Sequence, residues 1–514
     1  MSQSKISGRV FIYFMTLKTS SVSIVILAMT ILIVGCRKEK FTTDSGDLLL
    51  FARDTISFDT VFSTIGSTTK FFTVINPHSK SIRISEIKLE GGQNSQFRIN
   101  VDGIDGGVHQ DVEIMGGDSL YIFVEVTVDP NNSSTPFIIE DRITFLTNGT
   151  VQKVVLNAWG QDANFHGGLS GVFTFFPLEC DEVWNNDKPH VIYGKLLVEE
   201  GCTLTINAGV QVYVHAKSGI FVNGGTIIIQ GQKGNEVVFQ GDRLEPLYQD
   251  LTGQWGIQFD IPIETGTGPQ IASIIRGGIW IFESPGSSID WAIIKNGNIG
   301  IQVDTTGVAL NGTEYSTTIS NTKIENMAGY GLWAQGATLR GSNLLISNCA
   351  SAAAYLSIGG RYQMDNCTFA NYGTASVRTQ PTFALNNYYE DVNQNLIVRP
   401  LVNCSFRNCI MFGSNAFLND FNEFVIDVEE SGSPQYLFEY CLVDTDINVN
   451  NGSQFNEMKN GLGPFFLNPG GGDFHISTND SRMFGQPFET SPFSDLDDVV
   501  SSNPFYKGCY NYVP

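Results

Sequence analysis

Residues 47–161 carry short segments in which apolar and polar positions alternate, which is the period of a β-strand with one buried face. Turn-forming Asn-Pro, Gly-Gly and Asn-Gly pairs separate these segments. About seven strands at this spacing predict a β-sandwich. The clearest strand segments are residues 70–76, 82–89, 119–127 and 151–158.

Residues 165–445 show a different pattern, in which short apolar runs end at Gly or Asn. The intervals between the Asn residues of five such runs are 30, 22, 18 and 42, the last close to two units of about 21. No run keeps a helical period, and the leucine-rich and propeller signatures are missing. In each run an apolar residue stands two positions before the Asn, at Asn296, Asn326, Asn348, Asn366 and Asn408.

Short strands joined by corners at this period predict a right-handed, single-stranded parallel β-helix, with about eleven coils between residues 190 and 440. Asn suits the corners because it adopts left-handed backbone geometry and can bond to an Asn one coil above. The predicted fold class is therefore all-β, an N-terminal β-sandwich followed by this β-helix. Residues 446–514 are predicted to be a C-terminal capping segment.

The sandwich region carries three motifs in a distinctive order: Val74-Ile-Asn-Pro, Gly116-Gly-Asp-Ser-Leu and Val154-Val-Leu-Asn-Ala-Trp-Gly. Their order resembles the Ig-like domains, similar to Hydin and major-sperm-protein sandwiches, near the start of many Bacteroidetes surface lipoproteins. The resemblance implies a structural or interaction module. No nucleophile with a base and no metal-ligand cluster is found in these residues.

The repeat region carries Phe239-Gln-Gly-Asp-Arg, Gly253-Gln-Trp-Gly-Ile and Asn366-Cys-Thr-Phe-Ala-Asn. These segments look like those of Bacteroidetes proteins with pectate-lyase-like parallel β-helices. The terminal Asp473-Phe-His-Ile and Gly508-Cys-Tyr-Asn-Tyr are similar to the end of the same group. The resemblance implies the fold and says little about a reaction.

Residues 1–35 have the features of an export signal. Three basic residues precede an apolar stretch at residues 22–34, which is short for a span of the bilayer core. The ending Ile33-Val34-Gly35-Cys36 resembles a bacterial lipobox. The resemblance implies that the Cys36 thiol is acylated and that the chain is a lipoprotein attached to a membrane.

Residues 36–46 are polar and aperiodic, and we interpret them as a tether. The predicted location is the cell envelope, as an outer-membrane or cell-surface lipoprotein. The alternatives are an ordinary secretory signal and a short anchor helix with an incidental Cys. Met15 is an alternative start to Met1.

Charge limits the partners. The chain has 52 Asp and Glu against 30 Lys and Arg, a net charge of −22, and loss of the basic residues 1–35 makes it −25. This charge repels phosphate backbones and argues against a nucleic-acid partner. No Walker, Rossmann or zinc motif is present, so we expect no nucleotide and no cofactor. The acidity is compatible with calcium, but no calcium motif supports it.

One group of candidate binding residues is Asp242, Arg243 and Glu245, in a long loop that precedes Trp255. These residues and Trp255 are candidates for the rim of a groove. The interpretation that we favour is a solvated loop with an Arg–carboxylate pair.

A second group is Arg340, Arg361 and Arg378, which recur at intervals of 21 and 17 residues. This spacing tracks the repeat, so the three residues are candidates for a basic stripe that would hold an anionic glycan. The interpretation that we favour is ordinary charge on a solvent face.

Cysteine follows Asn at three repeat positions, Asn348-Cys349, Asn366-Cys367 and Asn408-Cys409. We predict that these positions match and that the thiols stack as a column in the core. A metal site would require His or further Cys on the same face, and no His lies in these repeats.

These observations predict a lipid-anchored, exported β-helix protein that binds or displays a ligand without catalysis, with carbohydrate as the expected ligand class. The alternative is a polysaccharide lyase or glycoside hydrolase with a groove on the β-helix. The lyase would need a Lys or Arg base with calcium-binding carboxylates, and the hydrolase a carboxylate pair. A third reading is a scaffold whose sandwich docks a partner.

Overall fold

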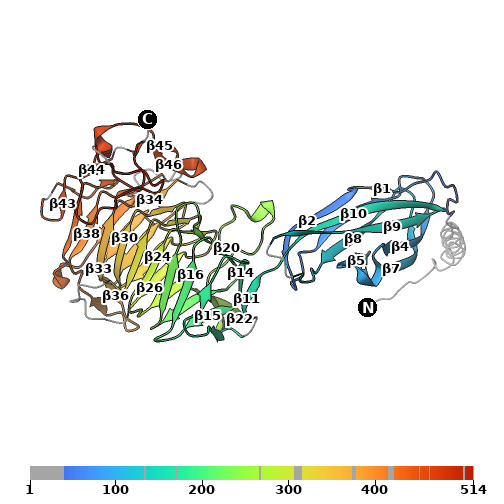
Figure 1. Ribbon diagram of the computed structural model, residues 1–514, viewed down its shortest axis with the longest axis horizontal. Helices are drawn as coiled ribbons and strands as arrows, with labels where there is room; N and C mark the ends of the chain where they lie inside the picture. The colour runs from blue at the N-terminus through green and yellow to red at the C-terminus, as the bar shows by residue number, and fades with distance from the viewer. Residues whose placement is uncertain are drawn as a thin grey trace, which may run out of the picture. The chain divides into compact units, whose positions relative to one another are not determined.

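The computed structural model (Figure 1) describes most of the chain in two compact units. The units are Met1–Asp129 with Phe137–Gly160, and Pro130–Pro136 with Gln161–Pro514. The predicted signal sequence and Cys36 lie outside the described residues. These are residues 40–131, 135–168, 171–265, 268–305, 315–372, 378–414, 422–450, 452–461, 463–501 and 504–512.

The first unit is a β-sandwich of two five-stranded sheets, with one core between them. Sheet A has the order β1-β3-β8-β5-β6, and sheet B the order β2-β10-β9-β4-β7. Alternation buries every second residue of a strand, as in β8, where Ile122 and Val124 face the core. The strands are β1 (Leu50–Phe51), β2 (Thr55–Phe62), β3 (Lys70–Ile75), β4 (Ile82–Leu89), β5 (Phe97–Val101), β6 (Ile104–Asp105), β7 (Val108–Ile114), β8 (Ser119–Val126), β9 (Phe137–Thr147) and β10 (Thr150–Gln161).

The second unit is a parallel β-helix built from three long parallel sheets. The first coil contributes β11 to sheet 1, β12 to sheet 2 and β13 to sheet 3. The next coil adds β14, β15 and β16, which pair in parallel with these three strands in the same order. Figure 1 shows β16, β24, β30, β33 and β38 of sheet 3 side by side. The predicted fold class, a sandwich followed by a parallel β-helix, is thus confirmed.

Sheet 1 contains 11 strands, which are β11 (Asn164–Gly167), β14 (His190–Tyr193), β17 (Gln211–Val214), β20 (Val237–Gly241), β25 (Ala292–Lys295), β28 (Lys323–Glu325), β31 (Leu345–Ser347), β34 (Thr368–Asn371), β39 (Ile410–Gly413), β42 (Leu442–Val443) and β44 (Lys459–Asn460). Sheet 2 contains nine, which are β12 (Phe175–Pro177), β15 (Lys195–Val198), β18 (Gly219–Asn223), β23 (Ile279–Phe282), β26 (Ile301–Asp304), β29 (Leu332–Gln335), β32 (Ala354–Ser357), β35 (Phe383–Asn386) and β40 (Phe424–Asp427). Sheet 3 contains ten, which are β13 (Val183–Trp184), β16 (Thr203–Asn207), β19 (Thr226–Gln230), β24 (Ser287–Asp290), β27 (Thr317–Ser320), β30 (Thr338–Ser342), β33 (Arg361–Asp365), β38 (Cys404–Arg407), β41 (Tyr436–Glu439) and β43 (Phe455–Asn456).

Three hairpins and five short 3-10 helices complete the described structure. The hairpins are β21 (Gln258–Thr265) with β22 (Gly268–Ile275), β36 (Tyr388–Glu390) with β37 (Leu396–Val398), and β45 (Phe466–Asn468) with β46 (Asp473–Ile476). The 3-10 helices are η1 (Gly92–Asn94), η2 (Pro246–Tyr248), η3 (Glu430–Gly432), η4 (Pro469–Gly471) and η5 (Ser481–Met483).

The core of the β-helix contains columns of aliphatic residues that stack in register from coil to coil. In sheet 2 one buried column is Leu196, Ile220, Ile279, Ile301, Leu332 and Ala354. Because parallel strands lie about 4.8 Å apart, each residue of such a column covers its neighbour and excludes water. Alternation along the strand sends the residues on either side of the column outward.

The five Asn residues with a left-handed backbone conformation lie at two different corners of the coil. The prediction that they occupy one repeat position is therefore wrong. Asn296, Asn326 and Asn348 follow strands of sheet 1, whereas Asn366 and Asn408 follow strands of sheet 3. All five have positive φ, between 52° and 66°. Asn326 Nδ2 donates to Asn296 Oδ1 at 2.7 Å, so the predicted bonding between coils exists. Both corners require a left-handed residue directly after a strand, so the same local pattern serves each.

The cysteine column is also assigned differently from the prediction. Cys367, Cys409 and Cys441 follow the left-handed residue at the corner between sheets 3 and 1, and all are fully buried. Cys349 lies at the other corner, so its position does not match theirs. Cys180 and Cys202 form a disulfide between two neighbouring coils. The sequence alone left this pairing open.

The end of the chain packs along the side of the β-helix. Leu345, Ile410 and Leu442 on the outer face of sheet 1 contact the apolar residues of the terminal segment, such as Phe474 and Tyr506. Figure 1 places β45 and β46 beside the last coils. The terminal segment therefore covers an apolar face that would otherwise be in water.

Candidate functional site

The outer face of sheet 2 carries a column of large side chains in strict register. The column consists of Phe221, Trp280, Gln302, Trp333 and Tyr355, one from each of five successive coils. With strands about 4.8 Å apart, the column extends over about 19 Å along the helix axis. All its members except the buried Gln302 are half-buried, so the rings combine a fixed position with an accessible face.

Neighbouring rings support one another along this aromatic column. The rings of Phe221 and Trp280 stack with centroids 4.2 Å apart. Tyr330 lies 5.4 Å from the Trp333 ring and 5.6 Å from the Tyr355 ring. Aromatic pairs at these separations are mutually attractive, so the rings are held in place before any ligand binds.

Asp304 stands at the centre of this face, beside the aromatic column. Its Oδ2 accepts hydrogen bonds from Trp280 Nε1 at 2.8 Å and from Gln302 Nε2 at 2.7 Å. Its Oδ1 is buried without a hydrogen-bond partner in the described part of the chain. Burial raises the pKa of Asp304 to about 6, although both hydrogen bonds and Arg276 oppose the shift. This carboxyl group therefore titrates close to neutral pH.

The predicted loop group is found beside sheet 1, where its members bond to one another or to nearby side chains. Asp242 Oδ2 lies 2.7 Å from His215 Nδ1 and accepts a hydrogen bond from Tyr193 at 3.4 Å. Arg243 donates two hydrogen bonds to Glu245, at 3.2 and 3.1 Å. The predicted Arg–carboxylate pair is present, and Asp242 belongs to a separate pair with His215.

The loop itself packs on the Asn residues of the corner between sheets 1 and 2. Asn296 Nδ2 donates to Gln249 O, and Asn326 Nδ2 donates to Asp250 O, both at 2.8 Å. Arg243 lies against the Tyr248 ring, 4.1 Å from its centroid, at a small pocket of about 130 Å³. These hydrogen bonds hold the loop at the corner, so the loop is packed on the β-helix and is not simply surrounded by solvent.

Trp255 is not a groove residue, which corrects the sequence interpretation. Its side chain is only 1% exposed and belongs to the β-helix core. Its Nε1 donates to Lys295 O at 2.8 Å, which satisfies the only polar atom of the ring. A Cβ at Gly278 would lie 2.2 Å from the ring, so the indole fills space that glycine leaves free.

The three arginines of the predicted basic stripe do not form one column, because Arg340 pairs with Gln363 and Arg361 with Thr338. Arg340 on β30 and Arg361 on β33 share the outer face of sheet 3, where Arg361 lies 4.5 Å from the Tyr315 ring centroid. Arg378 is instead buried and forms two hydrogen bonds with Glu423, at 2.7 and 2.6 Å. The interval of 17 residues that included Arg378 does not correspond to a step along one sheet.

Sequence reasoning did not find the aromatic column, although a local signal exists. At each of its aromatic positions the ring stands between two aliphatic residues of a strand, in Ile220-Phe-Val, Ile279-Trp-Ile, Leu332-Trp-Ala and Ala354-Tyr-Leu. The flanking residues face the core and the ring faces out. The same triplet also occurs in Val212-Tyr-Val of sheet 1 and in Leu120-Tyr-Ile of the sandwich, so it indicates an outward-facing ring but does not assign that ring to sheet 2.

No helix in the described segments is long and apolar enough to cross a membrane. Those segments also contain no group of three or more His, Cys, Asp or Glu arranged to hold a metal ion.

Comparison with known proteins finds low similarity throughout. No family model and no curated protein matches the chain. The solved complex of XylC with xylose is 8% identical, with a TM-score of 0.26, and the match covers 88% of each chain. The catalytic unit of a GH87 α-1,3-glucanase from Streptomyces thermodiastaticus is 9% identical, with a TM-score of 0.25, covering 73% of this chain and 78% of that one.

A family 123 glycoside hydrolase from Clostridium perfringens is 8% identical, with a TM-score of 0.16. The match covers 22% of this chain and 26% of the hydrolase, so the chain spans about a quarter of that protein. At these TM-scores the likenesses carry no argument about function, and the fold class rests on the three parallel sheets themselves.

Proposed function

We propose that this protein is a lipid-anchored, exported β-helix protein that binds a carbohydrate chain on the outer face of sheet 2 without cleaving it. The observation that carries the proposal is the aromatic column from Phe221 to Tyr355. Sugar rings present apolar C–H faces that pack on aromatic rings, and their hydroxyl groups require hydrogen-bond partners at the rim. Gln335 and Asp304 supply polar groups beside the rings.

The column also supports an extended ligand. It spans about 19 Å, and the same chemistry recurs from coil to coil. A polymer with a regular repeat that lay along the helix axis would meet several similar subsites. A small globular ligand would use only one or two of these coils.

The surroundings of Asp304 support binding over cleavage. A glycosidase uses two carboxyl groups about 5–10 Å apart across the scissile bond. In the register of sheet 2 the described residues on the coils next to Asp304 are Phe282 and Gln335, neither of which is an acid. Neither of these two register positions therefore supplies a second carboxyl group, although Glu283, which follows Phe282, donates its backbone N–H to Asp304 O at 3.1 Å.

Export is supported by the lipobox-like Ile33-Val34-Gly35-Cys36 and by the Cys180–Cys202 disulfide. Disulfides persist mainly in compartments outside the cytoplasm. Acylation of Cys36 would hold the protein at the cell envelope through more than one chain, which is stable attachment.

One observation favours the alternative of a polysaccharide lyase or glycoside hydrolase. The carboxylate of Asp242 holds His215 Nδ1, and the half-buried imidazole stacks on Tyr193 at 4.4 Å. A His oriented by a carboxylate is a common general base. If this pair acts on a substrate, the protein would release products from a polysaccharide.

Replacing both Trp280 and Trp333 by alanine is expected to weaken carbohydrate binding at least about tenfold, because two stacking surfaces are lost. The measurement is calorimetric titration of residues 37–514 with xylo-, gluco- and galacturono-oligosaccharides. Ile228→Ala and Leu437→Ala, half-buried on the outer face of sheet 3, are the matched controls and should bind like the parent.

Equal affinity of the double variant and the controls would disprove the role of sheet 2. Assays of the same mixtures for reducing ends and unsaturated uronates test cleavage. Products that form with the parent chain and disappear in His215→Ala would replace the binding proposal by the enzymatic one.

Replacing Cys36 by serine is expected to abolish incorporation of labelled fatty acid and to move the protein from the membrane to the soluble fraction. The measurement is fractionation of cells that express the full chain. Joint replacement of Cys180 and Cys202 by serine removes two other cysteines and should leave the label in place. Retention of the label in Cys36→Ser would exclude the lipobox interpretation.

A further inference from the structure

The outer face of sheet A in the sandwich carries an exposed cluster of three aromatic rings. Phe71 is 56% exposed and Tyr121 is 49% exposed, and both lie close to the half-buried Phe123. The Phe71 centroid lies 5.8 Å from that of Tyr121 and 6.0 Å from that of Phe123. We refer to these three residues as the aromatic platform. Exposed apolar clusters of this kind on a folded domain commonly mark a contact site.

The outer face of sheet B is mainly charged, although Ile138 and Trp159 are also exposed there at paired positions. It carries ion pairs between Arg83 and Glu113, and between Glu90 and both Arg142 and Lys153. Arg83 and Glu113 stand directly opposite each other on β4 and β7, and such charge pairs suit a surface in water. Sheet A thus exposes a cluster of three rings, whereas the exposed ring described on sheet B is that of Trp159, beside Ile138.

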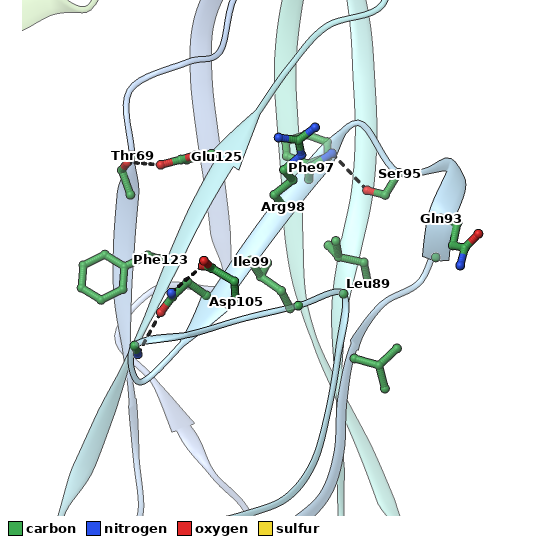
Figure 2. A pocket seen from close by; sticks show the side chains of 16 residues that line it. Thr69, Leu89, Gln93, Ser95, Phe97, Arg98, Ile99, Asp105, Phe123 and Glu125 are labelled. Atoms are coloured by element: carbon green, nitrogen blue, oxygen red, sulfur yellow. Dashed lines mark hydrogen bonds between the residues drawn. The ribbon is translucent and has the colours of Figure 1, made fainter.

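A pocket of about 980 Å³ adjoins the platform, and Figure 2 shows its lining. Phe123 and Glu125 of β8 line one side, and Leu89 and Gln93 line the other. Its lining includes residues of β5 and β6 at the edge of sheet A, where β6 pairs with two residues of β5. Ligand pockets in proteins measure about 300–1,000 Å³, so this one has the size of a small ligand and not of a folded partner.

Polar side chains surround the part of the pocket nearest the platform. Asn100 Nδ2 donates to Asp105 Oδ1 at 2.6 Å, and Thr69 donates to Glu125. Arg98, exposed on β5, stands directly opposite Glu125 on β8. Donors and acceptors thus lie within one or two strands of the aromatic rings, as Figure 2 shows for Thr69, Glu125, Phe123 and Arg98.

We propose that the aromatic platform and the adjoining pocket form a second binding site, for an oligosaccharide, that is separate from the face on sheet 2. Rings that stand out from a sheet offer the flat apolar surface on which a sugar ring stacks. The Asn, Arg, Thr and carboxylate groups beside them match the hydroxyl groups at the edge of that sugar. The pocket accommodates the next units of the chain.

A protein partner fits these features less well. A stable protein interface buries about 800 Å² on each side and has a continuous apolar core. Here three rings adjoin a recess whose rim is polar, and the rim groups would lose water without an assured partner. A single extended peptide paired along the free edge of β5 is the main competitor of similar size, and the experiment includes it.

The test starts from residues 37–514 that already carry Trp280→Ala and Trp333→Ala, so that binding to sheet 2 is removed. In this background, Phe71→Ala with Tyr121→Ala is expected to weaken binding of xylo- or gluco-oligosaccharides about tenfold. The matched control is Trp159→Ala, which removes a ring that is 48% exposed on sheet B. This control should bind like its parent.

Hydroxyl-radical footprinting with the same sugars provides a second measurement at single residues. Protection of Phe71 and Tyr121 is expected, with Trp159 unchanged. The proposal is overturned if the platform variant and the control bind alike, or if neither platform ring is protected. It is also overturned if only an extended peptide of alternating valine and threonine protects the rings.

The two binding proposals fail in different ways. If the sheet 2 proposal is wrong, Trp280→Ala with Trp333→Ala will leave binding unchanged, whereas loss of the platform rings will still lower it. If the platform proposal is wrong, binding will disappear with the two tryptophans and protection will be confined to sheet 2.

Discussion

Replacing Arg378 by alanine is expected to lower the free energy of unfolding of the β-helix by about 3–5 kcal/mol, because the carboxylate of Glu423 would remain buried without its counter-charge. The two side chains are 7% and 1% exposed and share two short hydrogen bonds. Glu423 also accepts from Thr382 Oγ1 at 2.6 Å, which is too little to balance a full charge. Urea denaturation followed by tryptophan fluorescence measures the change.

A double replacement distinguishes the contribution of the two charges to stability from the contribution of the volume that the side chains fill. Arg378→Met with Glu423→Leu removes both charges and keeps most of the volume, so its stability should lie within about 1–2 kcal/mol of the parent. If the double variant is as unstable as Arg378→Ala, packing and not the unpaired charge dominates, and the explanation is wrong.

Replacing Trp255 by alanine is expected to cost about 3–5 kcal/mol, the range for large aromatic residues in a core. The indole is 1% exposed and packs among core residues such as Phe239, with centroids 6.4 Å apart. Its loss would leave a cavity that the rigid coils cannot collapse around. The measurement is the shift of the denaturation midpoint.

Leu247 offers a matched control in the same loop. It is 82% exposed, so Leu247→Ala should change stability by no more than about 0.5 kcal/mol. A loss of ligand binding by Trp255→Ala with unchanged stability would restore the original interpretation of Trp255 as a groove residue.

The sequence could predict the coils because their pattern is local. Asn366 and Asn408 follow an apolar run at each corner, and an L-residue there must adopt a left-handed conformation that Asn tolerates. The same pattern could not assign a corner, because Asn348 after sheet 1 and Asn366 after sheet 3 meet the same local requirement. The corner at which a residue lies depends on the sheet to which the preceding strand belongs, and pairing with the strand of the previous coil sets that sheet.

The candidate site was less accessible to sequence reasoning. Charged residues drew attention to Asp242 and Arg378, yet each forms a pair within the protein. The aromatic column instead includes Trp280 and Trp333, which lie two coils apart on sheet 2. These two residues are 53 positions apart in the sequence. Insertions of different length between coils hide such a column from any fixed interval.

The class of fold could be predicted from the sequence, because alternation, Gly and Asn corners, and the period of the repeats are local consequences of backbone geometry. The sequence also carries the lipobox-like motif at Cys36, which remains a prediction. The contacts between side chains of different coils could not be predicted and are seen in the folded protein alone. Lateral stacking of coils places Phe221 beside Trp280 and buries Trp255, because contacts across a β-helix are set by register between strands and not by separation along the chain.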